Sequence, residues 1–383
     1  MSRPTGDDQV MLHPALRLAQ LKPSPIRILS EGAPPTAIPL GLGEPTWDMP
    51  QAALRALRET SGPCPYGPNF GLPELRDAVA HFHGATRDEV LITCGSEGAL
   101  FSLFLAFLNP GDEVLVPDPY FPAYTSLAHL AGAEAVTYPL DTNDRFRLKA
   151  APLLAALEAN PNIKAVVVNS PSNPTGGATT PDDLRRIAEA CKARGVMLIS
   201  DEVYIDLHYG TRPPSLRDVS DYGLVITSVS KGWGAAGLRV GWILGDPKWL
   251  GPARTVHGYA VTGASHPAQR AALALLEDSE SIFIAARREI RVRWEALAAA
   301  LKLHLGQVVT PPDGAFYHWI ELPESALVDP MAFCIRLRDE GGVVVVPGST
   351  FGPQGKRFAR LSFAAFPEQI TEGVSRMAPF WNA

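Results

Sequence analysis

A lysine in a short serine-rich stretch offers the clearest chemistry in this chain. Lys231 follows Ser228-Val229-Ser230 at the end of an apolar run, and Arg239 lies eight residues further on. Burial beside an apolar strand disfavours the charged form of an amine, so we expect a lowered pKa and a usable nucleophile. Two seryl hydroxyls and an arginine nearby suit a bound phosphate. An amine beside a phosphate cradle suggests a Schiff base to pyridoxal 5'-phosphate (PLP), although a buried lysine that snorkels or pairs with a carboxylate fits this stretch equally well.

The elements that must position these residues follow from alternating apolar runs and helical stretches. Short apolar strands separated by helices are typical of a largely parallel sheet that is covered on both faces. We expect strands at 90–93, 113–116, 135–138, 165–169, 196–200, 224–228 and 240–244. The helix between two of them shows its limits plainly, with Thr180 as N-cap, Pro181 at the first position and Gly195 as the stop.

The pattern changes after about residue 250, where a smaller α+β domain is expected. A long helical region at 268–303 precedes strands at 315–322, 343–346 and 358–363, with helices near 331–339 and from 367. The sequence therefore predicts an α/β fold: a three-layer α/β/α arrangement with a mostly parallel sheet and a smaller C-terminal domain. We assign 1–45 to an N-terminal arm, irregular and proline-rich over 1–37, then 46–255 to the large domain and 256–383 to the small one.

The ends of the predicted strands carry the residues most suited to bind a ligand, since ligands of doubly wound sheets lie at the carboxyl ends of the strands. Gly95-Ser96-Glu97 follows the first strand and opens a helix, whose free backbone N–H groups suit a phosphate, although an ordinary strand–helix turn has the same form. Phe121 follows the second strand, where an aromatic ring stacks on a flat cofactor or simply joins the core.

Two further strand ends, together with the one that precedes Lys231, complete the set. Asn173 stands in a stiff proline-rich loop after the strand at 165–169 and offers a fixed amide. Asp201 directly follows a buried strand, where an acid is costly unless paired, so it suits a protonated ring nitrogen or a salt bridge to an arginine. Tyr204 lies three residues further on and suits a phenolic ring oxygen. Five successive strand ends thus each carry part of one plausible PLP site.

Composition limits the other function classes. The chain has 383 residues and a net charge of 34 − 40 = −6, without a basic run, so no nucleic acid partner is expected. Its N-terminus resembles neither a signal peptide nor a membrane span, and no membrane partner is expected. The four scattered cysteines lack metal-ligand spacing, which predicts buried thiols, no metal and a reduced, cytoplasmic environment.

At this point the sequence resembles the class I/II aminotransferases, which are fold-type I PLP enzymes. The matching stretches, which together span residues 41 to 363, are Gly43-Glu44-Pro45, Tyr66-Gly67-Pro68-Asn69-Phe70-Gly71, Gly95-Ser96-Glu97-Gly98-Ala99, Asn173-Pro174-Thr175-Gly176, Ser200-Asp201-Glu202-Val203-Tyr204, Ser228-Val229-Ser230-Lys231 with Arg239, Pro347-Gly348-Ser349-Thr350-Phe351-Gly352 and Arg360-Leu361-Ser362-Phe363. Their combination in this order is specific to that family, although each stretch alone is not.

The resemblance implies a role for each site residue and a homodimer with shared sites. Lys231 would form the Schiff base and move the proton, Asp201 would pair with the pyridine nitrogen, and Tyr204 with Asn173 would bond the ring oxygen. Ser96, the backbone of Glu97, Ser228 and Arg239 would hold the phosphate, joined by Tyr66 from the neighbouring subunit. Arg360 would bind the substrate α-carboxylate with Asn173 and the Gly43 backbone, whereas without the motif a surface charge is the simpler interpretation.

The resemblance implies transfer of an amino group between an L-amino acid and a 2-oxo acid. Some aspartate-using members place a lysine where Glu97 stands, and others present an arginine from the neighbouring subunit, where this chain has only His257–Thr262. We therefore expect a neutral or aromatic donor, unless Arg27 or Arg254 supplies a distal cation. The alternatives are an aspartate-type aminotransferase, a C–S lyase on the same scaffold, and a non-enzymatic sensor. We expect the sensor least, because the residues before the first motif are too few for the DNA-binding domain that such a sensor needs.

Overall fold

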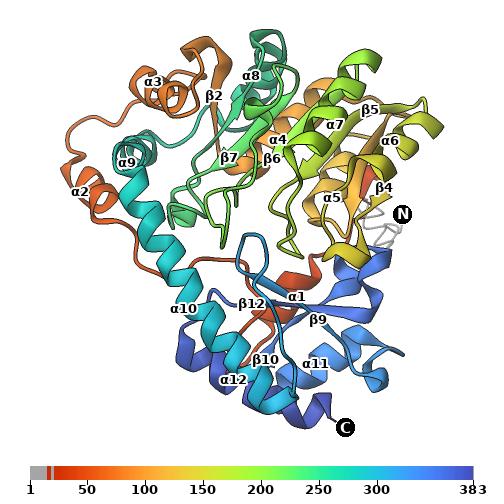
Figure 1. Cartoon of the computed structure of the whole chain (residues 1–383). Coiled ribbons are helices and arrows are strands. Elements are labelled where there is room, and N and C mark those ends of the chain that lie inside the picture. The colour runs from red at the N-terminus through yellow and green to blue at the C-terminus, as the bar shows by residue number, and fades with distance from the viewer. Residues whose placement is uncertain (1–14, 19–20, 383) are drawn as a thin grey trace, which may run out of the picture.

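Apolar, β-branched runs build a seven-stranded sheet in the larger part of the molecule (Figure 1). The computed structural model describes residues 15–18 and 21–382. The strands of this sheet, in spatial order, are β2 (Val90–Thr93), β8 (Gly241–Leu244), β7 (Leu224–Ser228), β6 (Met197–Asp201), β5 (Ile163–Asn169), β3 (Glu113–Asp118) and β4 (Glu134–Pro139). Strand β8 runs antiparallel to both neighbours, and the other pairs are parallel. The sheet is therefore mixed but mostly parallel, which agrees with the prediction.

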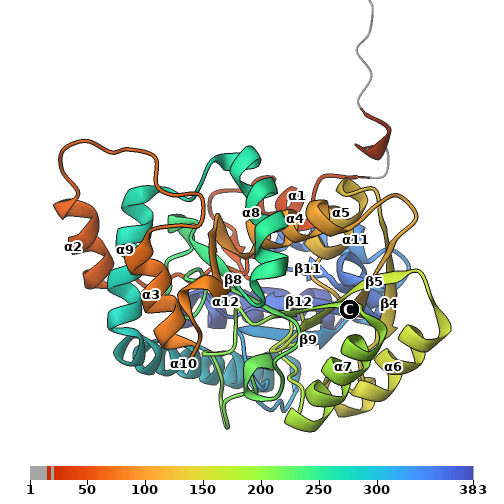
Figure 2. The same ribbon diagram turned by 90° about the horizontal axis from the view of Figure 1, so that it is seen from above.

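Helices cover both faces of this sheet because successive strand residues point to opposite sides. Val114 and Val116 face α4 (Gly95–Phe107), α5 (Ala123–Leu130) and α8 (Pro247–Val261), whereas Leu115 faces the opposite core. That second core includes α2 (Gln51–Glu59), α3 (Pro73–Phe82), α6 (Ala150–Ala159), α7 (Pro181–Arg194) and α9 (His266–Glu277) (Figure 2). The predicted three-layer α/β/α arrangement is confirmed.

The predicted limits of α7 are also present. The Thr180 hydroxyl accepts a hydrogen bond from the backbone N–H of Asp183 at 3.1 Å, and Pro181 occupies the first helical position. Gly195 ends the helix with φ +64°, a left-handed conformation that glycine adopts without steric cost.

The smaller C-terminal domain is built on a three-stranded antiparallel sheet in the order β11 (Val346–Pro347), β12 (Phe358–Ser362) and β9 (Tyr317–Glu321). Helices α10 (Ser279–Leu305), α11 (Pro330–Gly341) and α12 (Pro367–Trp381) pack around it, and α10 runs from beside α9 down to α12 (Figure 1). The N-terminal arm joins this domain, since β1 (Ile38–Pro39) pairs in parallel with β10 (Val343–Val344).

Three local predictions were wrong. The arm predicted as irregular contains α1 (Pro25–Glu31), which begins at a proline and buries Leu29 in the core of the small domain. The helical region at 268–303 is two helices, α9 and α10, separated at Asp278. The strand at 343–346 divides at Val345, so that its halves join different sheets. The domain limits at 45 and 255 stay a prediction, and α8 runs through the second of them.

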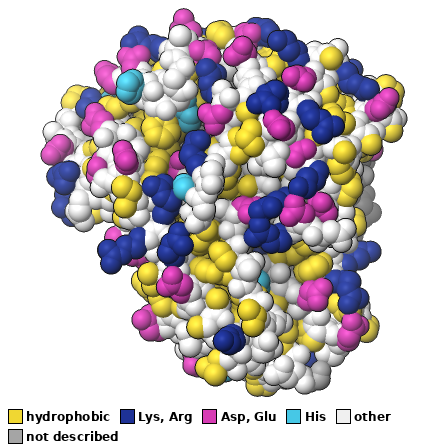
Figure 3. Space-filling view, viewed as in Figure 1, with side chains coloured by type: hydrophobic (Ala, Val, Ile, Leu, Met, Phe, Trp, Pro, Cys, Tyr) yellow, Lys and Arg dark blue, Asp and Glu magenta, His cyan; other side chains and the backbone are white. Residues whose placement is uncertain are grey.

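Charges of both signs are interspersed on the face of the molecule shown in Figure 3. This mixture agrees with the small net charge of the whole sequence. Among the described residues, no helix is both long and apolar enough to cross a membrane.

Candidate active site

A cavity of about 580 Å³ lies at the carboxyl ends of the central strands, against the small domain. That volume is within the usual range for sites of small ligands and cofactors. Eleven residues predicted from the sequence line it: Gly43, Ser96, Glu97, Phe121, Asn173, Asp201, Tyr204, Ser228, Lys231, Arg239 and Arg360. The structure thus brings together side chains that are up to 317 residues apart in the sequence (360 − 43).

Lys231 lies at the centre of this cavity, in the loop that follows β7. Its Nζ donates a hydrogen bond to the backbone oxygen of Gly43 at 2.5 Å and lies 5.7 Å from the centre of the Tyr204 ring. Burial lowers the pKa of Lys231 to about 8, and the nearby positive charge of Arg360 acts in the same direction. An amine with this pKa has a substantial uncharged fraction near neutral pH, as a nucleophile or a proton carrier requires.

Asp201 ends β6 as a buried carboxylate with a buried tyrosine against it. The Tyr124 hydroxyl donates to Asp201 Oδ2 at 2.7 Å, and the N–H of Val203 approaches Oδ1 at 3.4 Å. Burial raises the pKa of Asp201 to about 6, which the Tyr124 hydrogen bond partly opposes. Tyr124 therefore fixes one carboxylate oxygen, and the more weakly bonded Oδ1 has capacity for a cationic donor such as a protonated ring nitrogen.

The loop after β5 carries Asn173 and is fixed by the side chain that ends the strand. Asn169 accepts the backbone N–H of Asn173 at 2.8 Å and donates its own amide to the backbone oxygen of Asp201 at 3.0 Å. On the other side of the cavity, the hydroxyls of Tyr204 and Tyr317 are 2.7 Å apart and buried. Tyr204, Tyr317 and Asn173 thus present polar groups whose positions are determined by their neighbours.

The anionic end of a cofactor is best accommodated where α4 begins. Ser96 and Glu97 occupy the first turn of α4, beside Ser228 and Arg239. Gly95 lies behind this wall with φ +73°, and a Cβ there would come within 2.7 Å of Arg239 Nη2. Free N–H groups at a helix start, seryl hydroxyls and a guanidinium form the donor set that a phosphate prefers.

Arg360 on β12 closes the opposite end of the cavity and is 1% exposed. Its Nη1 donates to Asn173 Oδ1 at 2.8 Å and its Nη2 donates to the backbone oxygen of Gly41 at 2.6 Å. The guanidinium also lies 4.5 Å from the ring centre of Tyr317. Its Nε is buried without a hydrogen-bond partner, and burial lowers the pKa of Arg360.

Two predicted or suspected residues lie elsewhere in this single chain. Tyr66 is 89% exposed in the loop before α3 and does not line the cavity. The Arg254 guanidinium lies 4.5 Å from the centre of the Phe70 ring and is likewise absent from the lining. Arg27 on α1, in contrast, does line it.

Sequence reasoning missed several lining residues. Tyr124 stands three residues after Phe121 and was assigned no role, while Tyr317 was placed only in a strand. Asn169 ends the strand before the Asn173 loop, and its polar side chain at a strand end was the available signal. The arm residues Ser24 and Ile26 gave no signal, because α1 itself was not predicted.

These features define a pyridoxal-phosphate site of fold type I, and the chain belongs to the aminotransferase class I and II family, whose model matches residues 35–377. It is 31% identical to an aspartate aminotransferase of Geobacillus stearothermophilus, covering 96% of this chain and 99% of that one. The solved structure of an aspartate aminotransferase from Thermus thermophilus with maleate matches with a TM-score of 0.88 and 30% identity, covering 97% of this chain and 100% of that chain. An N-succinyldiaminopimelate aminotransferase from Mycobacterium tuberculosis matches with a TM-score of 0.88 and 28% identity over 96% and 100%.

The protein is therefore a PLP-dependent aminotransferase, and the predicted family, fold and cofactor are confirmed. The residues present fit that cofactor. A buried acid whose Oδ1 is weakly bonded, a lysine amine with a lowered pKa and a helix start with seryl and guanidinium donors lie around one cavity of suitable size. Among the described residues, no cluster of three or more histidine, cysteine, aspartate or glutamate side chains has the arrangement to hold a metal ion.

Proposed function

We propose that this aminotransferase exchanges an amino group between an L-amino acid and a 2-oxo acid, with a neutral or aromatic amino acid as the preferred donor. The observation that carries the proposal is Arg360. Its guanidinium is buried, unpaired with any carboxylate among the described residues, and has one unsatisfied N–H. Since a buried charge without a counterion is costly, the arrangement favours an anionic substrate group, and every α-amino acid carries an α-carboxylate.

Each cavity residue then has a proposed task. PLP, when bound, supplies an electron sink for the carbon from which the proton is removed. Asp201 holds the protonated ring nitrogen, and Tyr204 with Asn173 bonds the ring oxygen. Ser96, Glu97 through its backbone, Ser228 and Arg239 hold the phosphate, with Gly95 shaping the turn, and Phe121 stacks on the ring. The paired bonds from Arg360 orient the substrate Cα–H toward Nζ of Lys231, which removes that proton. The same amine returns a proton when the amino group passes to the 2-oxo acid.

The donor preference rests on the charges that line the cavity. The carboxylates of Glu44 and Glu97 both line it and disfavour a second carboxylate on the substrate. One observation favours a second candidate, a dicarboxylic donor such as aspartate: Arg27 also lines the cavity, and the relatives reported above include aspartate aminotransferases. Arg27, Glu44 and Glu97 are all exposed, so solvent screening makes each contribution small, and the two carboxylates outnumber the one guanidinium.

We further propose a homodimer in which Tyr66 reaches the phosphate of the neighbouring subunit. Support comes from two large aromatic side chains that are uncovered in the single chain: Tyr66, in the loop before α3, and Tyr259, which is 92% exposed on α8. Exposed aromatic residues of this size are typical of interfaces.

A donor screen tests the proposed function. The holoenzyme is incubated with neutral, aromatic and dicarboxylic L-amino acids against 2-oxoglutarate, pyruvate and oxaloacetate, and the new amino acid is quantified. We expect transfer from neutral or aromatic donors to exceed transfer from aspartate. A strong preference for aspartate that Arg27→Ala removes would establish the second candidate. Release of ammonia and pyruvate from a cysteine conjugate, without transfer, would instead identify a lyase.

A further inference from the structure

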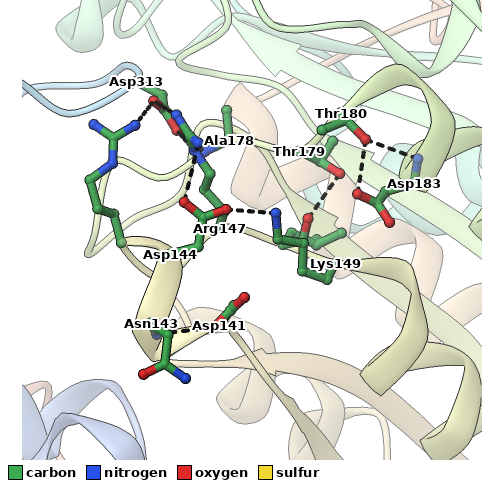
Figure 4. Close-up of polar contacts among 12 residues, drawn as sticks. Asp141, Asn143, Asp144, Arg147, Lys149, Ala178, Thr179, Thr180, Asp183 and Asp313 are labelled. Carbon is green, nitrogen blue, oxygen red and sulfur yellow. Dashed lines mark hydrogen bonds and ion pairs between the residues drawn. The ribbon is translucent and has the colours of Figure 1, made fainter.

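Four hydrogen bonds converge on the carboxylate of Asp313, at the junction between the loops of the large sheet and the small domain (Figure 4). Arg147 forms a fork on it, with Nε at 2.7 Å from Oδ2 and Nη2 at 2.7 Å from Oδ1. Arg145 adds a bond at 3.1 Å to Oδ1, and the backbone N–H of Ala178 donates to Oδ2 at 3.0 Å. A carboxylate with this many donors is held in one position.

The surroundings favour the charged form of this group. The side chain of Asp313 is 18% exposed, and burial by itself would raise its pKa. The Arg147 fork and the Ala178 N–H outweigh burial and hold the pKa of Asp313 below its usual value. Charge-assisted bonds in a partly buried position are stronger than those on an open surface, so Asp313 is a firm anchor for the segments that it joins.

The first of these segments is the loop 170–178, which carries Asn173. Ala178 is its last residue, and the neighbouring Gly177 lies so close to the turn of Arg145 that a Cβ there would come within 2.9 Å of the Arg145 oxygen. Gly314, next to Asp313, donates its N–H to the backbone oxygen of Gly176 at 3.0 Å. Asp313 and its arginines therefore support the back of the Asn173 loop.

The second segment is the start of β9, since Asp313 precedes Tyr317 by four residues. Tyr317 lies with its ring centre 4.5 Å from the Arg360 guanidinium, and its hydroxyl contacts that of Tyr204. Asn173, on the first segment, accepts from Arg360 Nη1. Two of the groups that fix Arg360 thus belong to segments that meet at Asp313.

We propose that Asp313, through its fork with Arg147, is a positioning residue for the α-carboxylate site. It touches neither substrate nor cofactor in this arrangement, and it acts by fixing Asn173 and Tyr317, which in turn fix Arg360. The inference rests on the proposed function in one respect only, namely that Arg360 binds the α-carboxylate. It predicts that loss of the Asp313 charge weakens substrate binding more than PLP binding, because Asn173 is one of several residues proposed to hold PLP, whereas Asn173 and Tyr317 both fix Arg360.

The test uses Asp313→Asn, which keeps the shape and removes the charge, and Arg147→Lys, which removes the fork but keeps the charge. Asp182→Asn is the matched control, because Asp182 pairs with Arg185 at 2.6 Å in the same region but is 87% exposed. Binding of an α-methyl amino acid, which has the α-carboxylate but no Cα hydrogen, is titrated spectroscopically on each holoenzyme. We expect its Kd and the KM of donors to rise about 3- to 30-fold in both test variants, the range for coupling through a packed network. The control should stay at the wild-type value, and kcat should change less than KM.

Amide hydrogen exchange of a peptide covering 170–178 provides a measurement independent of turnover. We expect faster exchange there in Asp313→Asn and Arg147→Lys than in the control, with a smaller rise in the PLP Kd than in the analogue Kd. Unchanged exchange and unchanged analogue binding in both test variants would overturn the inference. A loss of PLP affinity equal to the loss of analogue affinity would also overturn it, as general destabilisation. If Arg360→Lys itself leaves analogue binding unchanged, the proposed function fails instead, whatever exchange in the loop shows.

Discussion

The Tyr124 hydroxyl donates a hydrogen bond of 2.7 Å to Asp201, and both side chains are buried. This bond stabilises the carboxylate form of Asp201, whose pKa burial raises to about 6. Removing a donor to the charged form of an acid raises the pKa of that acid further. The charge state of Asp201 therefore depends on Tyr124, and so does the affinity for the protonated ring of PLP that we propose Asp201 holds.

For Tyr124→Phe we expect PLP affinity to fall as the pH is lowered, with a midpoint above that of the wild type. The sign follows from Asp201, which is ionised above its pKa and neutral below it, so that a higher pKa moves the loss of affinity to higher pH. The PLP Kd of the apoprotein is measured between pH 5 and 8. Tyr138→Phe is the control, because the Tyr138 hydroxyl is buried too but donates to the backbone oxygen of Val167. A midpoint equal in the two variants would contradict this dependence.

Arg360→Lys tests the carboxylate end of the cavity. A lysine supplies a point charge in place of two oriented bonds, so kcat/KM should fall by similar factors for all donors. The expected loss is roughly 10²-fold or more, about 2–4 kcal/mol, as for breaking a desolvated charged pair. PLP affinity should be nearly unchanged, since Asp201, Ser228 and Arg239 lie at other parts of the cavity. A large loss of PLP affinity would place Arg360 on the phosphate instead.

Lys231→Ala tests the assignment of the amine. Borohydride should fix PLP covalently to the wild-type protein on the peptide that contains Lys231, because only an uncharged amine near the cofactor carbonyl reacts. The variant should lose this label and all transfer activity, while noncovalent PLP binding persists. Mass spectrometry of the reduced, digested proteins gives the result. Labelling of the same peptide in the variant would refute the assignment.

Mixed dimers test the role of Tyr66. Chains with Tyr66→Ala and chains with Lys231→Ala are each expected to have little activity alone. If Tyr66 serves the neighbouring subunit, the mixed dimer has one site with both native residues, and about half of the wild-type activity per dimer returns. If Tyr66 serves its own chain, no mixed site is intact and activity stays low. If sedimentation shows that a fully active protein is a monomer, the proposal of a site shared between subunits is wrong.

His83 gives a prediction for stability against pH. It is held close against Trp242, whose Nε1 donates to His83 Nε2 at 3.1 Å, and burial lowers the pKa of His83 to about 3. Since the unfolded chain takes up a proton near pH 6.5 that the folded one refuses, this histidine destabilises the fold as the pH falls from about 6.5 to 3, by up to about 1.4 kcal/mol per pH unit. His83→Gln keeps an acceptor without titrating, so its unfolding free energy should fall less steeply over that interval. Chemical denaturation at several pH values gives the slope, and equal slopes in the wild type and His83→Gln would contradict this assignment.

Much of this site follows from the sequence because it lies at strand ends. Ser96, Asp201 and Lys231 each stand directly beside a strand or helix whose pattern is plain, so topology alone brings them to one edge of the sheet. The family resemblance supplied Arg360, because its pairing with Asn173 joins residues 187 apart in two domains. Tyr124 and Asp313 were not assigned roles, since their partners depend on side-chain packing that no periodicity encodes. The short helix α1 was missed because proline-rich composition outweighed its seven residues.

The pairing of β1 with β10 has a consequence for the order in which the protein is made. Ile38 is paired with Val343, which is 343 − 38 = 305 residues later, and Gly41 accepts its bond from Arg360. A ribosome has released every strand of the large sheet before β10 exists, so the half that binds the cofactor can form during translation. The residues that follow Pro39 must wait for the end of synthesis to acquire their partners. The proposed phosphate end of the cavity is thus an early product of the nascent chain, and the proposed carboxylate end is a late one.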